Sequence, residues 1–189
     1  MDALEPFVLP PDLLERVLRI GVKKIYNRGH RFINGQSPAN LLFFVQKGAI
    51  RNCLRQEEFE LTFWIGIEQD FFCTIGFFSG TAAENFLEVM ETLEVVEIKR
   101  DQLQQAYLQD PGLERFGRLL AEYQLQVLER NHRLIREKSA LKRYHLFLDS
   151  YPQLNGRVHQ KYLASLLNLD QATLSRVRRK SPGLKPEEV

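Results

Sequence analysis

The segment that decides the fold runs from Val158 to Lys180 and reads VHQKYLASLLNLDQATLSRVRRK. It divides into two short helical patterns joined by a tight turn at Asn168, a residue type that tolerates a left-handed backbone. Asp170 is expected to cap the second helix, because its carboxylate can accept hydrogen bonds from the free amides of the first turn. The apolar residues of the two patterns are Leu163, Ala164, Leu166, Leu167, Leu174 and Val177. Their spacing predicts a helix-turn-helix, and the alternative is an ordinary helical hairpin with a solvated basic face.

Polar and basic side chains gather on the other face of the second helix. They are Gln171, Ser175, Arg176 and Arg179. This layout is typical of a helix-turn-helix whose second helix enters the major groove of DNA. Residues 139–189 contain nine Lys and Arg against four Asp and Glu, a net charge of +5, whereas residues 1–138 carry −3. Positive charge concentrated at one end favours a polyanionic partner there.

Composition indicates a globular protein. The 189 residues suffice for one large or two small domains, and 44% are hydrophobic and 26% charged. No apolar run reaches the roughly 18 residues of a membrane span, and no signal peptide opens the chain. The two cysteines, Cys53 and Cys73, are far apart and belong to no CxxC motif. We therefore expect buried thiols in a cytoplasmic protein that has no membrane partner.

Between an N-terminal helix and residue 99 the pattern is that of strands. The helix is predicted over 12–20, where apolar residues recur at helical spacing after Pro10 and Pro11. From Val22 onward, short runs rich in β-branched and aromatic residues alternate with turn residues. The predicted strands cover 32–33, 41–45, 50–54, 60–65, 86–90 and 93–98. Strands at this density indicate a closed antiparallel barrel or a roll, and not a parallel sheet.

A long helix is predicted from Pro111 to about residue 138, with Asp110 as its N-cap. Apolar residues recur along it at steps of three and four, with Arg130 at the one missing position. They are Leu113, Phe116, Leu120, Tyr123, Val127 and Leu134. We interpret this stripe as a heptad seam that pairs two copies of the chain through residues 113–134. Packing against the strands would account for part of it.

A shorter helix over 139–150 and a loop over 151–156 lead into the helix-turn-helix. In this order the parts resemble the Crp/Fnr superfamily of transcription regulators over nearly the whole chain. The most specific stretches are residues 71–78, FFCTIGFF, and residues 170–177, DQATLSRV. The resemblance implies an α+β fold in three parts. These are an antiparallel β-roll sensor domain of jelly-roll (double-stranded β-helix) type over 1–109, a dimerisation helix over 110–138 and a small all-α helix-turn-helix domain over 139–189.

The resemblance also implies partners and site residues. The partners are double-stranded DNA, a second copy of the chain and RNA polymerase. Gln160 and Thr173, each near the start of a helix, are expected to donate to phosphates, and Arg179 to supply charge to the DNA backbone. The residues expected at base edges are Gln171, Ala172, Ser175 and Arg176. Because the DNA-binding protein would be a dimer, its DNA site is expected to be an imperfect palindrome.

The ligand pocket departs from the superfamily pattern. In nucleotide-binding members a glutamate holds the ribose hydroxyl, and an arginine ten residues later pairs with the cyclic phosphate and precedes Ser, Thr or Ala. The corresponding residues here are Thr74, Glu84 and Asn85. A carboxylate in place of the arginine repels a phosphate, and Thr74 cannot accept hydrogen bonds as a carboxylate does. We therefore expect no cyclic AMP binding in the usual mode, an effector of unknown chemistry or none, and no metal or cofactor.

The DNA-binding half is expected to be shorter than in many members of the superfamily. Many members carry a two-stranded wing after the second helix, but only residues 181–189 follow it here, and the loop 151–157 has no room for a hairpin. One alternative is a sensor or protein-interaction module with a vestigial helix-turn-helix. Another is an enzyme on a jelly-roll scaffold, which needs about two histidines and a carboxylate among the strands. His30 is the only histidine in that region and is expected to be solvated, so we expect no enzyme activity.

Overall fold

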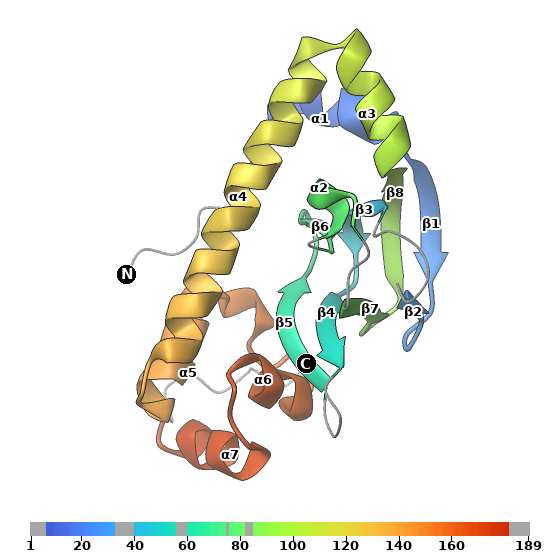
Figure 1. Cartoon of the computed structure of the whole chain (residues 1–189). Coiled ribbons are helices and arrows are strands. Elements are labelled where there is room, and N and C mark those ends of the chain that lie inside the picture. Colours follow the sequence, from blue (N-terminus) through green and yellow to red (C-terminus); the bar gives the residue numbers. More distant parts are fainter. Residues whose placement is uncertain (1–6, 33–39, 56–59, 75, 82–84, 182–189) are drawn as a thin grey trace.

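The computed structural model of the chain describes residues 7–32, 40–55, 60–74, 76–81 and 85–181 (Figure 1). The strands are β1 (Val22–Tyr26), β2 (Arg31–Phe32), β3 (Leu41–Lys47), β4 (Ile50–Arg55), β5 (Glu60–Gly66), β6 (Phe71–Cys73), β7 (Asn85–Val89) and β8 (Leu93–Lys99). The helices are α1 (Pro11–Leu18), α2 (Gly76–Ser79), α3 (Arg100–Gln109), α4 (Pro111–Arg136), α5 (Ala140–Ser150), the short 3₁₀ helix η1 (Pro152–Leu154), α6 (Gln160–Leu166) and α7 (Gln171–Arg179).

The described strands form two antiparallel four-stranded sheets. Their order is β1-β8-β3-β6 in one sheet and β2-β7-β4-β5 in the other. Both sheets contribute buried side chains to one core, among them Phe43, Ile50, Phe72, Leu87 and Val95. The predicted α+β class and antiparallel roll are thereby confirmed. The closed barrel is wrong, because each of the two sheets keeps its edge strands, β1 and β6 in one and β2 and β5 in the other.

The long helix α4 begins where the sequence predicts. Asp110 accepts a hydrogen bond from the Gly112 amide at 2.9 Å, and Arg16 of α1 donates to it from Nε at 3.0 Å. The helix α3 immediately before it is absent from the sequence-based prediction. Its apolar face is short, made of Leu103, Ala106 and Tyr107, and Leu103 is its one buried residue. So short a pattern is a weak sign of a helix in the sequence.

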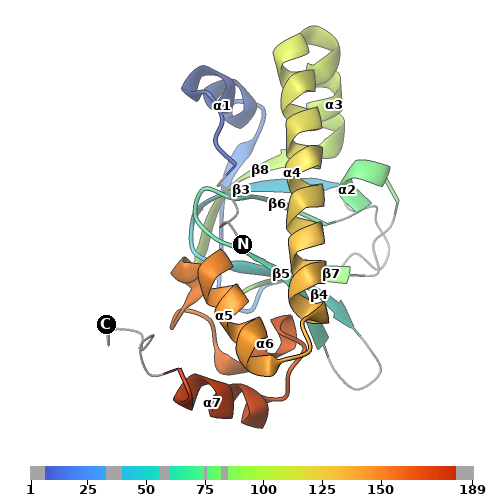
Figure 2. The same cartoon turned by 90° about the vertical axis from the view of Figure 1, so that its left-hand side faces the viewer.

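The apolar stripe of α4 is buried inside the chain. Leu113, Phe116 and Leu120 pack with α1 and with the strands. Farther along, Val127 joins the core between the sheets, and Leu134 joins the core of the C-terminal helices. The interpretation of these residues as a dimer seam is therefore wrong. A spacing of three and four also arises where one helix lies first along a roll and then along a helical unit, as α4 does (Figures 1 and 2).

The helices after α4 form a unit that rests on the roll. Its buried residues include Tyr144, Phe147, Leu163, Leu174 and Val177. The same core takes in Ile65 of β5, and Ile67 and Met90, which directly follow β5 and β7. Only η1 lies between α5 and α6, as expected for a loop with no added hairpin. Residues 182–189, on which the expected absence of a wing rests, lie outside the described residues. No helix in the described part of the chain is long and apolar enough to cross a membrane.

Candidate nucleic-acid interface

The turn between α6 and α7 has the predicted geometry. Asn168 has a left-handed backbone with φ 50°. Asp170 caps α7 by accepting hydrogen bonds from the Thr173 amide at 2.7 Å and from Thr173 Oγ1 at 2.8 Å. These bonds lower the pKa of the Asp170 carboxyl, so it is ionised where the helix dipole favours a negative charge. Leu174 and Val177 are buried on the inner face, so the predicted turn and cap are confirmed.

The residues predicted to contact DNA lie together on and beside α7. The exposed ones are Gln171, Ala172, Arg176 and Arg179, and the partly exposed ones are Gln160, Thr173 and Ser175. Gln160 begins α6, yet its Nε2 donates to the carbonyl of Gln171 at 3.1 Å, so the starts of the two helices are adjacent. Helix α7 lies at the end of the molecule opposite α1 and α3 (Figures 1 and 2).

Two of these side chains already make hydrogen bonds within α7. Thr173 Oγ1 gives its proton to Asp170 and accepts a hydrogen bond from Arg176 Nη2 at 2.9 Å. Arg176 Nε lies 3.4 Å from the carbonyl of Ala172. A phosphate contact by Thr173, or a base contact by Arg176, would therefore exchange an existing hydrogen bond for a new one.

Arg143 of α5 is a positioning residue that sequence reasoning missed. Its Nη1 donates to the carbonyls of Leu167 at 2.6 Å and Asn168 at 2.9 Å. Its Nη2 donates to the carbonyl of Glu137 at 2.7 Å, just after α4 ends. One guanidinium thus ties the turn of the helix-turn-helix to the end of the long helix. No local motif marks this residue, since an arginine on a helix predicts only a solvated charge.

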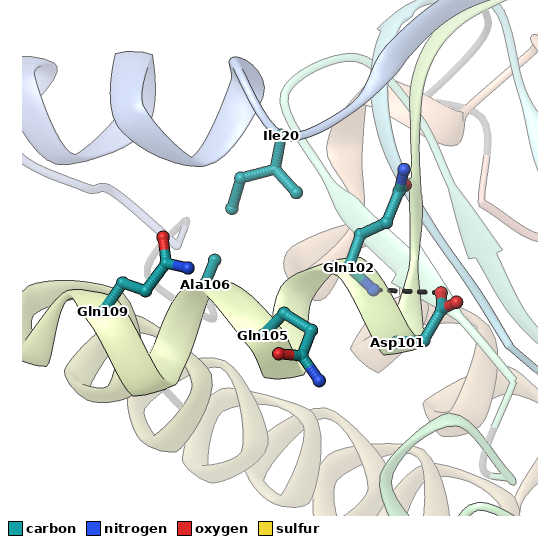
Figure 3. Close-up of a pocket in the computed structure, with 6 residues that line it drawn as sticks. All are labelled: Ile20, Asp101, Gln102, Gln105, Ala106 and Gln109. Carbon is teal, nitrogen blue, oxygen red and sulfur yellow. Dashed lines mark hydrogen bonds between the residues drawn. The ribbon is translucent and has the colours of Figure 1, made fainter.

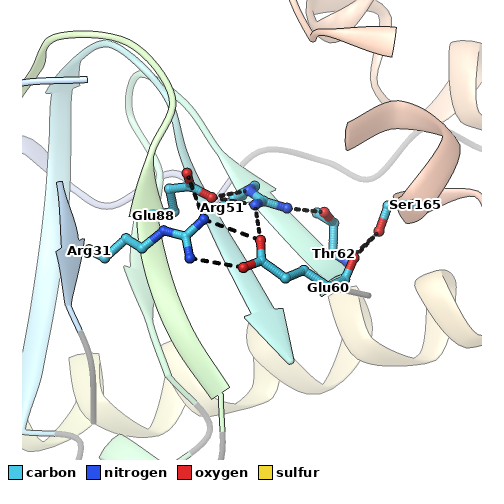
Figure 4. A network of polar contacts seen from close by, with 6 residues as sticks. All are labelled: Arg31, Arg51, Glu60, Thr62, Glu88 and Ser165. Atoms are coloured by element: carbon cyan, nitrogen blue, oxygen red, sulfur yellow. Dashed lines mark hydrogen bonds and ion pairs between the residues drawn. The ribbon is translucent and has the colours of Figure 1, made fainter. Parts of the chain in front are cut away.

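Helix α6 is attached to the free edge of β5. The Thr62 amide donates to Ser165 Oγ at 2.8 Å, and Ser165 Oγ donates to the carbonyl of Glu60 at 2.9 Å (Figure 4). A neighbouring strand would make bonds of this kind with an edge strand. The first helix of the helix-turn-helix is therefore held in one place on the roll.

A buried charge network lies on the same sheet. Arg51 is 2% exposed, and its Nε donates to Glu88 at 2.8 Å. The same guanidinium donates to Glu60 at 2.8 Å and to Thr62 Oγ1 at 3.0 Å. Arg31 of β2 pairs with both carboxylates, so every charge of the network faces an opposite one (Figure 4). This pairing offsets the cost of burying the Arg51 guanidinium.

Two further contacts join the C-terminal helices to the roll. The ring of Tyr162 in α6 covers Arg51, whose Cζ lies 3.9 Å from the ring centroid. Arg157, just before α6, donates from Nη1 to Glu68 at 2.6 Å and from Nη2 to Glu91 at 2.9 Å. The hydrogen bonds from Arg157 lower the pKa of Glu68 to about 2.

A cavity of about 610 Å³ lies between the roll, α4 and α6. Its apolar wall includes Trp64, Phe78, Leu125, Val127, Leu128 and Leu166. Its polar wall includes Asn52, Thr74, Gln124, Asn131, His132 and Ser165. Among the described residues that line it there is no Asp, Glu, Lys or Arg.

Of the three predicted pocket residues, Thr74 lies in the wall of this cavity. It is buried, and its hydroxyl has no hydrogen-bond partner. Asn85 is buried in β7, where its Nδ2 donates to Asn52 Oδ1 at 2.6 Å. Glu84 lies outside the described residues. The opposing carboxylate that the sequence predicts therefore lies outside what the structure describes, and the role of Thr74 in a ligand pocket stays a prediction.

The remaining candidate positions show no reactive arrangement. A shallow hollow between α3 and the residues after α1 is lined by Ile20, Asp101, Gln102, Gln105, Ala106 and Gln109 (Figure 3). Its one carboxylate, on Asp101, accepts a hydrogen bond from the Gln102 amide at 2.9 Å. Cys53 and Cys73 are free thiols, and burial raises the pKa of each to about 12. His30 is exposed, and no group of three His, Cys, Asp or Glu side chains in the described ranges could hold a metal.

No protein-family model and no curated protein sequence matches the chain. Solved structures do match it. FixK2 from Bradyrhizobium japonicum is 20% identical with a TM-score of 0.74, covering 87% of this chain and 85% of that chain. The c-di-GMP responsive global regulator CLP from Xanthomonas campestris is 19% identical with a TM-score of 0.72, covering 95% and 96%. A crp/fnr family protein from Eubacterium rectale is 15% identical with a TM-score of 0.65, covering 93% and 84%. The chain therefore has a Crp/Fnr-type fold, as the resemblance predicts.

Proposed function

We propose that this chain, with its Crp/Fnr-type fold, is a sequence-specific DNA-binding transcription regulator whose helix α7 enters the major groove. The exposed face of α7 carries the proposal. The guanidinium of Arg176 can donate two hydrogen bonds to a guanine base, and the side-chain amide of Gln171 can make two hydrogen bonds with an adenine base. The methyl group of Ala172 suits a thymine methyl, and the basic end of the helix suits phosphates. Such a regulator acts in the cytoplasm, and contact with RNA polymerase stays a prediction.

A second copy would supply the second reading helix. Support comes from an exposed seam on α4, made of Leu125, Leu128, His132 and Ile135 together with the partly exposed Ala121. These residues follow steps of four and three, as in a coiled coil. Ala121, Leu128 and Ile135 each follow a residue of the buried stripe by one position, which is about 100° round the helix. Leu125 is 65% exposed and Leu128 is 53% exposed. Pairing through this seam would direct two copies of α7 to major grooves about 34 Å apart, on an imperfect palindrome.

The effector is proposed not to be a cyclic nucleotide held in the usual mode. Thr74 stands where a carboxylate would hold the ribose, and the described lining of the cavity offers no Lys or Arg for a phosphate. A calorimetric titration with cyclic AMP should show no binding. Binding in the micromolar range would overturn this part of the proposal.

Selection from a random library of double-stranded DNA tests the main proposal. The full chain should enrich an imperfect palindrome, and its affinity for that site should fall by orders of magnitude between about 50 and 200 mM salt, because phosphate contacts release counterions. The second candidate function is a sensor or protein-interaction module with a vestigial helix-turn-helix. The attachment of α6 to β5 favours this module, because a helix-turn-helix fixed on the roll could not adjust its position to DNA. Failure to enrich any sequence would support that module and overturn the DNA-binding proposal.

A further inference from the structure

The side chain of Arg143 in α5 joins the ends of two other helices. Its Nε and Nη2 donate to the carbonyl of Glu137 at 3.1 and 2.7 Å, and its Nη1 donates to the carbonyls of Leu167 at 2.6 Å and Asn168 at 2.9 Å. Glu137 is the C-cap of α4, and Leu167 is the C-cap of α6. The last carbonyls of a helix have no partner inside that helix and carry a partial negative charge, so a cation is favourable there. One guanidinium therefore serves the C-terminal ends of both helices.

The planar shape of the guanidinium makes this contact directional. Its N–H groups point along fixed directions in one plane, so the three carbonyls must keep their places relative to one another. The apolar core that includes Leu134 of α4 and Leu174 of α7 also joins these helices. Apolar attraction has no preferred direction, so this core alone would tolerate a small rotation of the helix-turn-helix. Arg143 therefore restrains an angle that the core leaves less well defined.

The angle that Arg143 restrains is the one between α4 and α7. Only residues 167–170 separate α6 from α7, and two of them accept hydrogen bonds from Arg143. In the proposed dimer the two copies pair along α4, and two-fold symmetry repeats any shift of α7 in the second copy. A shift of about 1.7 Å in each copy would change the separation of the two α7 helices by about 3.4 Å, which is the rise of one base pair.

We propose that Arg143 is a positioning residue that sets the spacing of the two half-sites in the DNA that this chain recognises. It would do so by holding the turn after α6 at a fixed place relative to the end of α4. The inference rests on the proposed DNA-binding function and dimer, and it goes beyond them by assigning the choice of spacing to a residue outside α7. Binding of the second half-site is intramolecular, so it depends on this geometry, whereas binding of a single half-site does not.

Binding to three kinds of DNA tests the choice of spacing. They are a single half-site, the selected palindrome, and palindromes whose half-sites lie one base pair closer together or farther apart. The wild type should prefer the selected spacing by at least about tenfold. Arg143→Ala should bind the single half-site within about twofold of the wild type and the selected palindrome at least about fivefold more weakly, with a matching loss of the spacing preference. A merely less stable variant would lose affinity equally on all three DNAs, and equal losses would overturn the inference.

Two further variants separate the directional hydrogen bonds from the charge. Arg143→Lys keeps the charge, but an ammonium group cannot reach three carbonyls from one plane, so this variant should lose the spacing preference as Arg143→Ala does. Lys142→Ala removes the charge of the exposed neighbour and is the matched control, because any loss of affinity should be equal at every spacing. A spacing preference like that of the wild type in Arg143→Lys would overturn the positioning role.

A distance measurement on the free protein tests the geometry without DNA. Spin labels on Gln126→Cys in α4 and Lys180→Cys after α7 report the placement of α7, since both positions are exposed and both native cysteines are buried. The labelled chain is diluted with unlabelled chain, so that label pairs within one chain dominate. Arg143→Ala should widen or shift the distance distribution by more than about 3.4 Å, the rise of one base pair. An unchanged distribution would overturn the inference.

The two measurements together distinguish this inference from the proposed function. If the chain binds no DNA at all, the proposed function fails, while the spin labels still decide whether Arg143 restrains α7. A wider distance distribution combined with an unchanged spacing preference would overturn the role of Arg143 in the choice of spacing.

Discussion

The amide of Thr62 donates a hydrogen bond to the hydroxyl of Ser165 at 2.8 Å, across 103 positions of sequence. Ser165 in turn donates to the carbonyl of Glu60 at 2.9 Å. Because β5 ends its sheet in the described part of the chain, no other described strand pairs with these backbone groups on that side. Main-chain atoms of the roll therefore help to set the position of α6, and with it that of α7.

Removing the Ser165 hydroxyl should loosen this attachment. Ser165→Ala leaves the buried Thr62 amide unpaired, so the free energy of unfolding in urea should fall by about 1–3 kcal/mol. Ser175→Ala in α7 is the matched control and should change it by no more than about 0.5 kcal/mol. Equal effects of the two substitutions would mean that the attachment contributes nothing to stability.

Two buried threonines should respond to the same substitution with opposite signs. Thr74→Val removes a hydroxyl that has no partner, so the free energy of unfolding should rise by about 1 kcal/mol. Thr62→Val removes a hydroxyl that accepts a hydrogen bond from Arg51 at 3.0 Å, so the same quantity should fall by about 1–3 kcal/mol. Thermal and urea denaturation of both variants check this. A loss of stability in Thr74→Val would mean that its hydroxyl is satisfied in solution.

A charge in the exposed seam should separate the proposed dimer. Leu125→Glu would bury a carboxylate between two α4 helices, weakening association by at least about 3 kcal/mol as read by sedimentation equilibrium. Leu108→Glu on α3 is the control, because Leu108 is 82% exposed and lies off the seam. If Leu125→Glu associates as tightly as Leu108→Glu, the two copies do not pair through this seam.

Arg176 should determine part of the DNA sequence preference. Arg176→Ala should lower the affinity for the selected palindrome by about 1–3 kcal/mol and relax the preference at one base pair of each half-site. Arg115→Ala, which removes the same charge near the start of α4, should leave that preference intact. Binding is measured on the selected site and on its single-base variants. A uniform loss across all sequences would assign Arg176 to a phosphate instead.

Asp70 should make stability depend on pH. Burial raises the pKa of its carboxyl from 3.8 to about 6, although the Ile67 amide donates to it at 2.9 Å. Between these values the folded state binds more protons than the unfolded state, so this group lowers stability as the pH rises, and the loss is complete above about 6. Asp70→Asn should therefore match the wild type near pH 4 and exceed it by up to about 2 kcal/mol at pH 7.5. A less stable Asp70→Asn at pH 7.5 would show that the carboxylate is stabilising.

Local features of this chain were predictable because each acts within a few residues. Asp110 and Asp170 cap the helices that follow them, and Asn168 takes the left-handed backbone of the turn. The choice of face on α4 was not predictable in this way. Both the stripe that begins at Leu113 and the exposed seam that begins at Ala121 have the spacing of a coiled coil. Only the packing of α4 on the roll decides which one remains free.

The attachment of the two halves could not be predicted for a different reason. Ser165 and Thr62 are ordinary polar residues, and their meeting depends on the whole path of the chain between them. Arg51 is an arginine on a strand, for which a solvated position is the usual expectation. Its burial depends on the carboxylates of Glu60 and Glu88 and on the ring of Tyr162. These three residues lie in three different elements, β5, β7 and α6, none of which is the strand of Arg51. Thr74 was found from the sequence only because the resemblance singled out its position.

The cap that α6 places on β5 also bears on aggregation. The strand reads ELTFWIG, and an uncovered strand edge of this composition is a template on which another molecule can add its own strand. Any motion that lifted the helix-turn-helix from the roll would uncover that edge. The Ser165 hydroxyl therefore helps both to cover this edge and to hold the helix-turn-helix in place.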